Sequence, residues 1–156
     1  MSQLRGTKLV LDVVQAGKNT ISGLGATRTL NSNESGSTVL LDRAAGIVVT
    51  LPVAKVGVYY DFVATASVTS NAYKIITGAG TELLIGGYTS VDTDTGNAVA
   101  FFSPNGSTHI AVSSNGTTTG GLLGTKLRFT CLSSTKWLVE GSVQGSGTVA
   151  TAFSAS

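Results

Sequence analysis

The sequence predicts an all-β protein, folded as an antiparallel β-sandwich or a jelly-roll-like domain. Apolar and polar residues alternate with a period of two in most segments, which is the spacing of a strand with one buried face. Threonine and valine are abundant and glycine separates the segments, which favours pleated strands joined by tight turns. A chain of 156 residues is long enough for one domain with its own core.

The clearest strands form a hairpin near the C-terminus. Residues 126–131 alternate strictly, which places Leu127, Phe129 and Cys131 on one buried face. Residues 136–140 have the same character, and the three residues Ser-Ser-Thr before them suit a short hairpin loop.

Other strands are predicted at intervals of about 8 to 14 residues, which is typical of a sandwich or jelly roll. The continuous apolar run Ile47–Leu51 indicates a strand covered on both faces, and Pro52 ends it because proline has no backbone donor. These further strands are residues 37–41, 46–51, 58–65, 73–77, 82–85, 98–102 and 108–113.

The two ends of the chain differ from its middle. Leu9, Leu11 and Val13 alternate with other residues, so the beginning of the chain is either an extended arm or the first strand of the sandwich. The end is rich in Gly, Ser, Thr and Ala and reads as a short tail pinned by Phe153. We therefore divide the chain into an N-terminal arm or first strands (residues 1–28), a sandwich body (29–143) and a C-terminal tail (144–156).

Composition limits the partners that we expect. Ten basic and eight acidic residues give a net charge of +2, and the basic residues are scattered, so we predict no nucleic-acid partner. No apolar run approaches the ~18 residues of a spanning helix, and the start lacks the apolar core of a signal peptide, so we predict no membrane association. The single cysteine, Cys131, fits synthesis in a reducing cytoplasm.

The residues that could serve catalysis or cofactor binding lack the spacing and partners that those functions need. The glycine-rich loop 115–125 precedes Lys126, but it lacks the spacing of a phosphate-binding loop and leads into a strand instead of a helix. His109 lies in an alternating strand and Cys131 in a buried one, with no partner indicated for either. We therefore predict no enzyme activity, no catalytic residues and no cofactor.

The segment that most resembles a metal site is an acidic turn. Asp92 and Asp94 are spaced like the first ligands of a calcium loop, but no glutamate closes the loop before Pro104. We interpret this segment as an acidic surface turn and leave cation binding open.

Five passages, in order between residues 29 and 154, carry a resemblance to a known family. They are Gly46–Pro52 (GIVVTLP), Tyr59–Val63 (YYDFV), Asn115–Gly121 (NGTTTGG), Lys136–Val139 (KWLV) and Gly147-Thr148 with Ala152–Ser154 (AFS). In this order they resemble small virion structural proteins of tailed bacteriophages, of the head decoration or cement family.

The resemblance implies a homotrimeric all-β subunit that binds the outside of the capsid and stabilises it by bridging capsomers. Its partners would be the major capsid protein and copies of itself, and its place the exterior of the virion. We expect subunit or capsid contacts from five residues: Arg5, Leu9, Leu11, Val13 and Phe153.

The alternative function is a tail-fibre, spike or head-fibre module that binds a host surface receptor or glycan. Such a module predicts exposed aromatic side chains gathered in loops, and Tyr59 and Tyr88 are the plausible members. A cell-wall hydrolase, the third possibility, would need paired carboxylates across a cleft.

Overall fold

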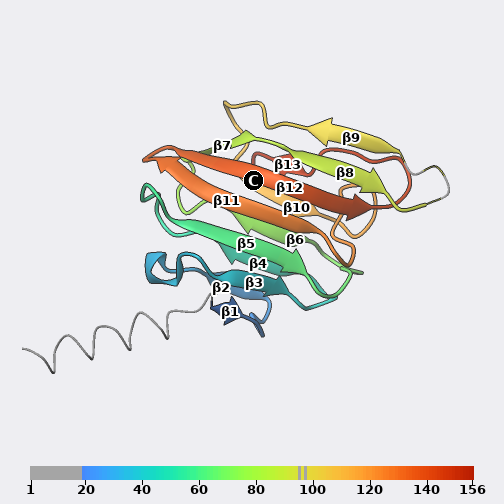
Figure 1. The fold of residues 1–156 in the computed structure, drawn as a ribbon, viewed down its shortest axis with the longest axis horizontal. Coiled ribbons are helices and arrows are strands. Elements are labelled where there is room, and N and C mark those ends of the chain that lie inside the picture. Colours follow the sequence, from blue (N-terminus) through green and yellow to red (C-terminus); the bar gives the residue numbers. More distant parts are fainter. Residues whose placement is uncertain (1–18, 95, 97) are drawn as a thin grey trace, which may run out of the picture.

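The computed structural model describes residues 19–94, 96 and 98–156, which form two β-sheets packed against each other (Figure 1). Sheet A contains, in spatial order, β1 (Thr20–Ile21), β3 (Thr38–Leu41), β5 (Tyr59–Ala64), β11 (Lys126–Ser133), β12 (Lys136–Gly145), β8 (Tyr88–Asp92) and β9 (Val99–Phe102), and β7 (Leu83–Gly86) also pairs with β12. Sheet B contains β13 (Phe153–Ser154), β10 (Ala111–Ser114), β6 (Tyr73–Ile76), β4 (Ile47–Thr50) and β2 (Thr27–Thr29). One turn of 3-10 helix, η1, spans Ser32–Glu34. The predicted all-β sandwich is confirmed.

The direction of the strands differs from the prediction of an antiparallel sandwich. The first six strands alternate between the sheets, so that β1, β3 and β5 run parallel in sheet A and β2, β4 and β6 run parallel in sheet B. This winding has the connectivity of a β-solenoid, in which each strand pairs with the next strand but one. The strand that lies in the opposite sheet supplies the crossover that each parallel pair needs. Both sheets are mixed, because β5 and β6 also pair antiparallel with β11 and β10.

Antiparallel pairing dominates the second half of the chain. The predicted hairpin is confirmed: β11 pairs with β12 from Lys126↔Ser142 to Ser133↔Lys136, and β11 also pairs antiparallel with β5. As predicted, Leu127, Phe129 and Cys131 are buried. The long strand β12 runs beside β7 in its first part and beside β8 in its second part.

Aromatic side chains fill the centre of the sandwich. Trp137 and Tyr60 have no exposed surface, and the rings of Phe62 and Phe129 meet edge to face with centroids 5.4 Å apart. The run Ile47–Leu51 was predicted to be covered on both faces, and this prediction is wrong. Its alternate side chains enter the core, but Val48 is 37% exposed because it points away from sheet A, on the uncovered face of sheet B.

A buried carboxylate ties three segments together. Glu82 is only 2% exposed, and one carboxylate oxygen accepts a hydrogen bond from the Ala54 backbone N–H at 2.7 Å. The other oxygen accepts the indole N–H of Trp137 at 3.0 Å. Both donors are thereby satisfied away from water, which is the condition for burying polar groups without a large cost.

Tyrosine hydroxyls in the core also form hydrogen bonds with the backbone of other segments. The Tyr60 hydroxyl donates to the backbone carbonyl of Asn31 at 2.6 Å. Burial, with a smaller contribution from the charge of Glu34, raises the pKa of Tyr60 to about 12. Burial also raises the pKa values of Tyr73 and Tyr88.

These raised pKa values predict that stability falls at alkaline pH. The folded chain favours the protonated phenols, so the stability they contribute is complete below the unfolded pKa of 10 and is lost as the pH rises toward 12. Urea titrations between about pH 9 and 12 should show a smaller loss for Tyr60→Phe than for the unsubstituted chain. An equal loss in both proteins would contradict this role for Tyr60.

The two ends of the chain differ. Strands β1 and β2, at residues 20–21 and 27–29, fall at the end of the segment predicted as an arm or first strands, whereas Arg5, Leu9, Leu11 and Val13 lie outside the described residues. The C-terminal tail predicted at 144–156 is part of the sandwich, because β12 continues to Gly145 and β13 pairs with β10.

Candidate interaction surfaces

The edge strand β9 carries the most exposed apolar strand residues of sheet A. Val99 is 65% exposed and Phe101 is 67% exposed, whereas Phe102 packs partly against the core. Among the described residues β9 pairs only with β8, so it is the edge of sheet A (Figure 1). Exposed apolar edge strands are uncommon because they pair readily with another strand. This edge is therefore a candidate contact surface.

The backbone of β9 presents free hydrogen-bonding groups on the same edge. The Asp92 N–H donates to the Ala98 carbonyl at 2.8 Å, which makes these two residues a hydrogen-bonded pair between β8 and β9. In an antiparallel ladder such pairs alternate, so Ala100 also turns its backbone groups toward β8. Val99 and Phe101 then direct their N–H and C=O groups away from β8.

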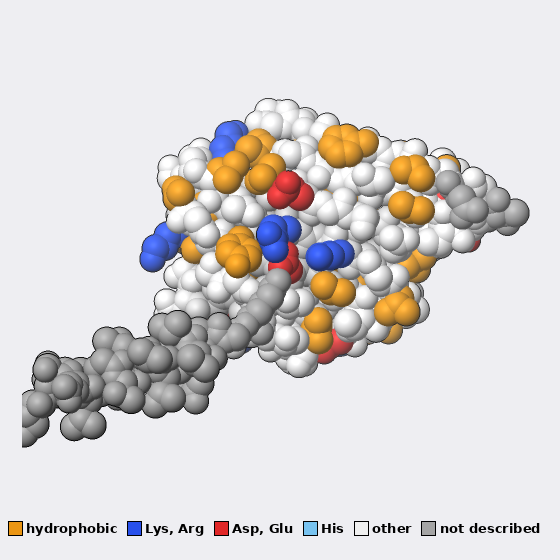
Figure 2. Space-filling model, in the orientation of Figure 1, with side chains coloured by type: hydrophobic (Ala, Val, Ile, Leu, Met, Phe, Trp, Pro, Cys, Tyr) orange, Lys and Arg blue, Asp and Glu red, His pale blue; other side chains and the backbone are white. Residues whose placement is uncertain are grey.

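Charged side chains cross the middle of the same face of sheet A. Asp61, Arg128 and Glu140 lie in register on β5, β11 and β12. Figure 2 shows this face, where basic and acidic side chains gather near the centre. They border a shallow hollow of about 340 Å³, together with Lys126. This face of sheet A therefore carries a row of alternating charges on β5, β11 and β12, and an uncharged edge at β9.

Arg128 is the centre of this charge row. Its guanidinium makes two hydrogen bonds to the Asp61 carboxylate, at 2.6 Å and 2.9 Å, and its central carbon lies 5.1 Å from the centroid of the Tyr59 ring. Hydrogen bonding to Asp61 raises the pKa of Arg128. The bidentate contact and the ring fix the orientation of the guanidinium. About half of the Arg128 side chain remains exposed and can meet a partner.

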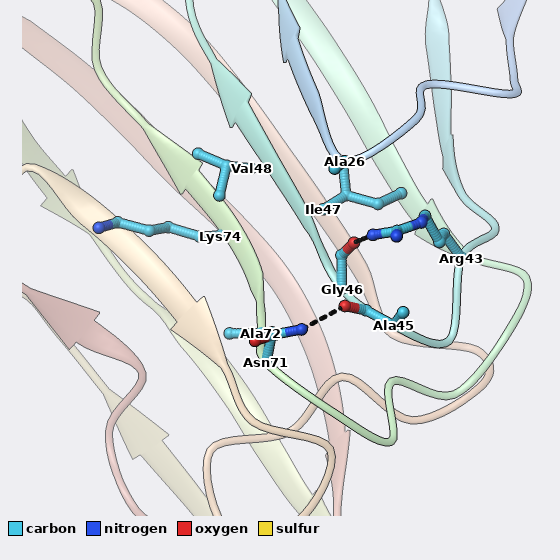
Figure 3. Close-up of a pocket in the computed structure, with 9 residues that line it drawn as sticks. All are labelled: Ala26, Arg43, Ala45, Gly46, Ile47, Val48, Asn71, Ala72 and Lys74. Carbon is cyan, nitrogen blue, oxygen red and sulfur yellow. Dashed lines mark hydrogen bonds between the residues drawn. The ribbon is translucent and has the colours of Figure 1, made fainter.

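A second hollow, of about 240 Å³, lies over β4 and β6 of sheet B (Figure 3). Two cationic side chains, Arg43 and Lys74, line it, and the other seven lining residues are uncharged. Arg43 donates to the Gly46 carbonyl at 2.7 Å, and the Asn71 amide donates to the Ala45 carbonyl at 2.8 Å. These bonds brace the turn before β4 and leave a small basic depression on this surface.

Phe153 is placed inside its own subunit, in contrast to the contact predicted for it. The residue is 5% exposed, and its ring lies 5.0 Å from the Tyr88 ring and is stacked with His109 at 6.1 Å. Strand β13 carries Phe153 into sheet B, where an apolar ring is covered by the core. Its role is to attach the end of the chain to the sandwich.

The acidic turn uses its carboxylates within the chain. Asp92 accepts the Asp94 N–H at 2.9 Å, and Asp94 accepts the Gly147 N–H at 2.7 Å. Within residues 19–94, 96 and 98–156, no three His, Cys, Asp or Glu side chains gather closely enough to hold a metal ion. The pair Asp92 and Asp94 thus connects the turn after β8 to the segment after β12.

The glycine-rich loop forms the tight turn that its sequence predicts. The Asn115 side-chain oxygen accepts the N–H groups of Thr117 and Thr119, at 2.9 Å and 3.1 Å. Gly116 and Gly120 have φ values of +85° and +84°, which favour glycine. The loop therefore has a structural role.

The aromatic residues predicted for receptor binding are not gathered in loops. Tyr88 is 1% exposed, and its hydroxyl accepts the Ala152 N–H at 2.6 Å. Tyr59 lies on β5 beneath Arg128. Exposed aromatic surface is instead found at Phe101, on the sheet edge, which the sequence pattern did not single out.

The fold and these surfaces define a two-sheet all-β protein with one exposed apolar edge. Comparison of the chain with protein-family models, with curated proteins and with solved structures found no significant match. Within the described part of the chain, no helix has the length and apolar character needed to cross a bilayer.

Proposed function

We propose that this chain is a non-enzymatic decoration protein of a bacteriophage capsid, which binds the outer surface of the head and bridges capsomers. The observation that carries the proposal is the exposed edge of sheet A, where Val99 and Phe101 present apolar side chains on the face that also carries Arg128, three strands away on β11. Apolar patches beside fixed charges are typical of surfaces that bind other proteins. The major capsid protein is the proposed partner.

The passages that resemble head decoration proteins support the proposal through their positions. They form β4, β5, β12, β13 and the turn after β10, which together build the sandwich. The resemblance therefore concerns residues that form the fold, and it includes Asp61 of the charge row and the adjacent Tyr59 but not β9. The homotrimer that the resemblance implies stays a prediction, which a native mass measurement tests.

Decoration would stabilise the shell by mass action. A protein that binds only the assembled capsid favours that state by about 2.7 kcal/mol per site when its free concentration is 100 times the dissociation constant. A rigid sandwich suits this role because little conformational freedom is lost on binding.

The proposal predicts that the purified protein saturates capsids that lack it and protects them from heat. Capsids of the phage that encodes the chain would be prepared without it, mixed with increasing protein, and assayed by sedimentation and thermal disruption. Occupancy over the whole shell with a raised disruption temperature is the expected result. Binding restricted to the tail vertex would favour the fibre or spike alternative, and absence of binding would reject both.

We further propose that Leu9, Leu11, Val13 and Arg5 contribute to capsid contacts. Deleting residues 2–18 removes them and leaves β1 and the rest of the described sandwich in place. We expect lower capsid occupancy with unchanged circular dichroism and thermal unfolding. Unchanged occupancy would reject the contact role of this segment.

A further inference from the structure

We propose that β9 pairs with β9 of a second copy of this chain across a two-fold axis. The pairing would use the free edge of sheet A, where Val99 and Phe101 expose their side chains and turn their backbone groups outward. It does not depend on the capsid role, because it rests only on the geometry and composition of the strand.

The positions of the outward backbone groups restrict the register, and only the pairing of Val99 with Phe101 of the second copy gives all four outward groups of each strand a partner within β9. Antiparallel pairing of two such edges makes Val99 and Phe101 of the second copy a hydrogen-bonded pair, and the symmetry repeats this pair on the other side of the axis. Ala100 then faces its own counterpart at the axis, in the non-hydrogen-bonded position where Cα atoms approach to ~4.5 Å. The smallest side chain of the strand thus lies where the two backbones are closest.

The side chains are complementary in this register. Val99 meets Phe101 of the second copy on one face of the joined sheet, and aromatic residues opposite β-branched residues are a favourable cross-strand combination. On the other face the methyl groups of the two Ala100 residues meet at the axis.

The absence of charge around β9 favours a second copy of the chain as the partner of this strand. The sequence contains no ionisable residue between Asp94 and His109, so identical edges meet without like-charge repulsion. Edge strands that must stay single are usually protected by an inward-pointing charge, a lysine or a proline, and β9 has none of these. A second β9 is neutral in the same way and completes the hydrogen bonds of the outward backbone groups.

The first test is the mass of the protein in solution as a function of concentration. Two four-residue strands bury less area than a standard interface of ~1,600 Å², so we expect a dissociation constant of about micromolar or weaker. Sedimentation equilibrium from about 1 μM to about 1 mM should show a species of twice 15.8 kDa. A monomer throughout this range, or a species of three times 15.8 kDa alone, would overturn the proposal.

Paired substitutions locate the contact. Val99→Lys should weaken dimerisation by about tenfold or more, because it brings two positive charges together near the axis. Leu123→Lys is the matched control, since Leu123 is 63% exposed, as Val99 is 65% exposed, but lies in a loop before β11. Equal effects of the two substitutions would contradict the assignment to β9. Circular dichroism and thermal unfolding would verify that both variants fold.

A disulfide crosslinking experiment tests the register of the β9–β9 pairing directly. In Ala100→Cys, two thiols meet across the axis within the Cα separation that a disulfide accepts. With oxidised glutathione, the thiols lose two protons and two electrons to form the S–S bond, and the glutathione disulfide is reduced to two thiols. A covalent dimer is expected on a non-reducing gel. The native Cys131 is buried, so the unsubstituted chain should stay uncrosslinked.

Val99→Cys controls for random collision, because it faces Phe101 of the second copy instead of another cysteine. Crosslinking of this variant as rapidly as Ala100→Cys would overturn the register, and failure of Ala100→Cys to crosslink would overturn the two-fold pairing. Capsid occupancy is measured separately, so a monomer that still decorates capsids rejects this pairing and leaves the proposed function standing.

Discussion

Replacing Glu82 with alanine is expected to lower the free energy of unfolding by about 2–5 kcal/mol, because it leaves one buried and one part-buried donor without an acceptor. In the folded chain its carboxylate accepts the Ala54 N–H and the Trp137 indole N–H, and Glu82 is 2% exposed. Urea unfolding followed by tryptophan fluorescence would measure the loss, since Trp137 is the only tryptophan.

Glu140→Ala is the matched control for this experiment. Glu140 is an exposed residue of β12, so its removal should change the free energy of unfolding by less than about 0.5 kcal/mol. Glu82→Gln keeps one acceptor oxygen and should fall between the two. A stability of Glu82→Ala within that same margin of the unsubstituted chain would show that the carboxylate does not hold these segments together.

Gly116→Ala should destabilise the chain by about 2–5 kcal/mol. The residue has φ +85°, and an added Cβ would lie 2.0 Å from the backbone carbonyl oxygen of Val68. Left-handed backbone costs an alanine about 1–2 kcal/mol, and the clash adds to this because a carbonyl in the neighbouring segment cannot rotate away.

Gly147→Ala separates these two costs. Gly147 has φ +72°, but an added Cβ would meet nothing closer than a Thr118 methyl carbon at 4.0 Å. We therefore expect a loss of only about 1–2 kcal/mol, from backbone strain alone. Thermal and urea unfolding of both variants give the difference, and equal losses would mean that the contact with Val68 is unimportant.

The strands that sequence alone could predict are those with an apolar inner face. The hairpin β11–β12 is the best example. Strand β8 escaped prediction because two of its inward residues, Ser90 and Asp92, are polar although they are buried. The alternation of hydrophobicity is therefore weak there, and only pairing with β9 and β12 defines the strand. Strands β1 and β13, with two residues each, are too short for any periodicity.

The parallel winding of the first half could not be predicted for a different reason. A period of two indicates which side chains are buried but not the direction of the neighbouring strand. Successive turns of the winding also differ in length, as the pairs Thr20↔Thr38 and Thr38↔Asp61 show, so no sequence repeat reveals them.

The candidate surface was only partly visible in the sequence. A strand at residues 98–102 was predicted, but the pattern Ala-Val-Ala-Phe-Phe does not say which side faces the core. Pairing of Phe102 with Tyr88 turns Phe102 inward and leaves Phe101 outside. Phe153 was predicted both to pin the tail and to make subunit or capsid contacts, and its burial in the core agrees with the first of these predictions.

The order of strands in sheet A has a consequence for the way the protein is made. Strands β11 and β12 are synthesised late, yet they lie between β5 and β8 and join the two parts of the sheet. Sheet A therefore remains incomplete during translation until Gly145 has emerged from the ribosome. Sheet B remains incomplete until β13, at residues 153–154, has emerged. Folding of the sandwich is completed only after β13 has been translated, so a truncation before residue 153 removes part of the sandwich itself.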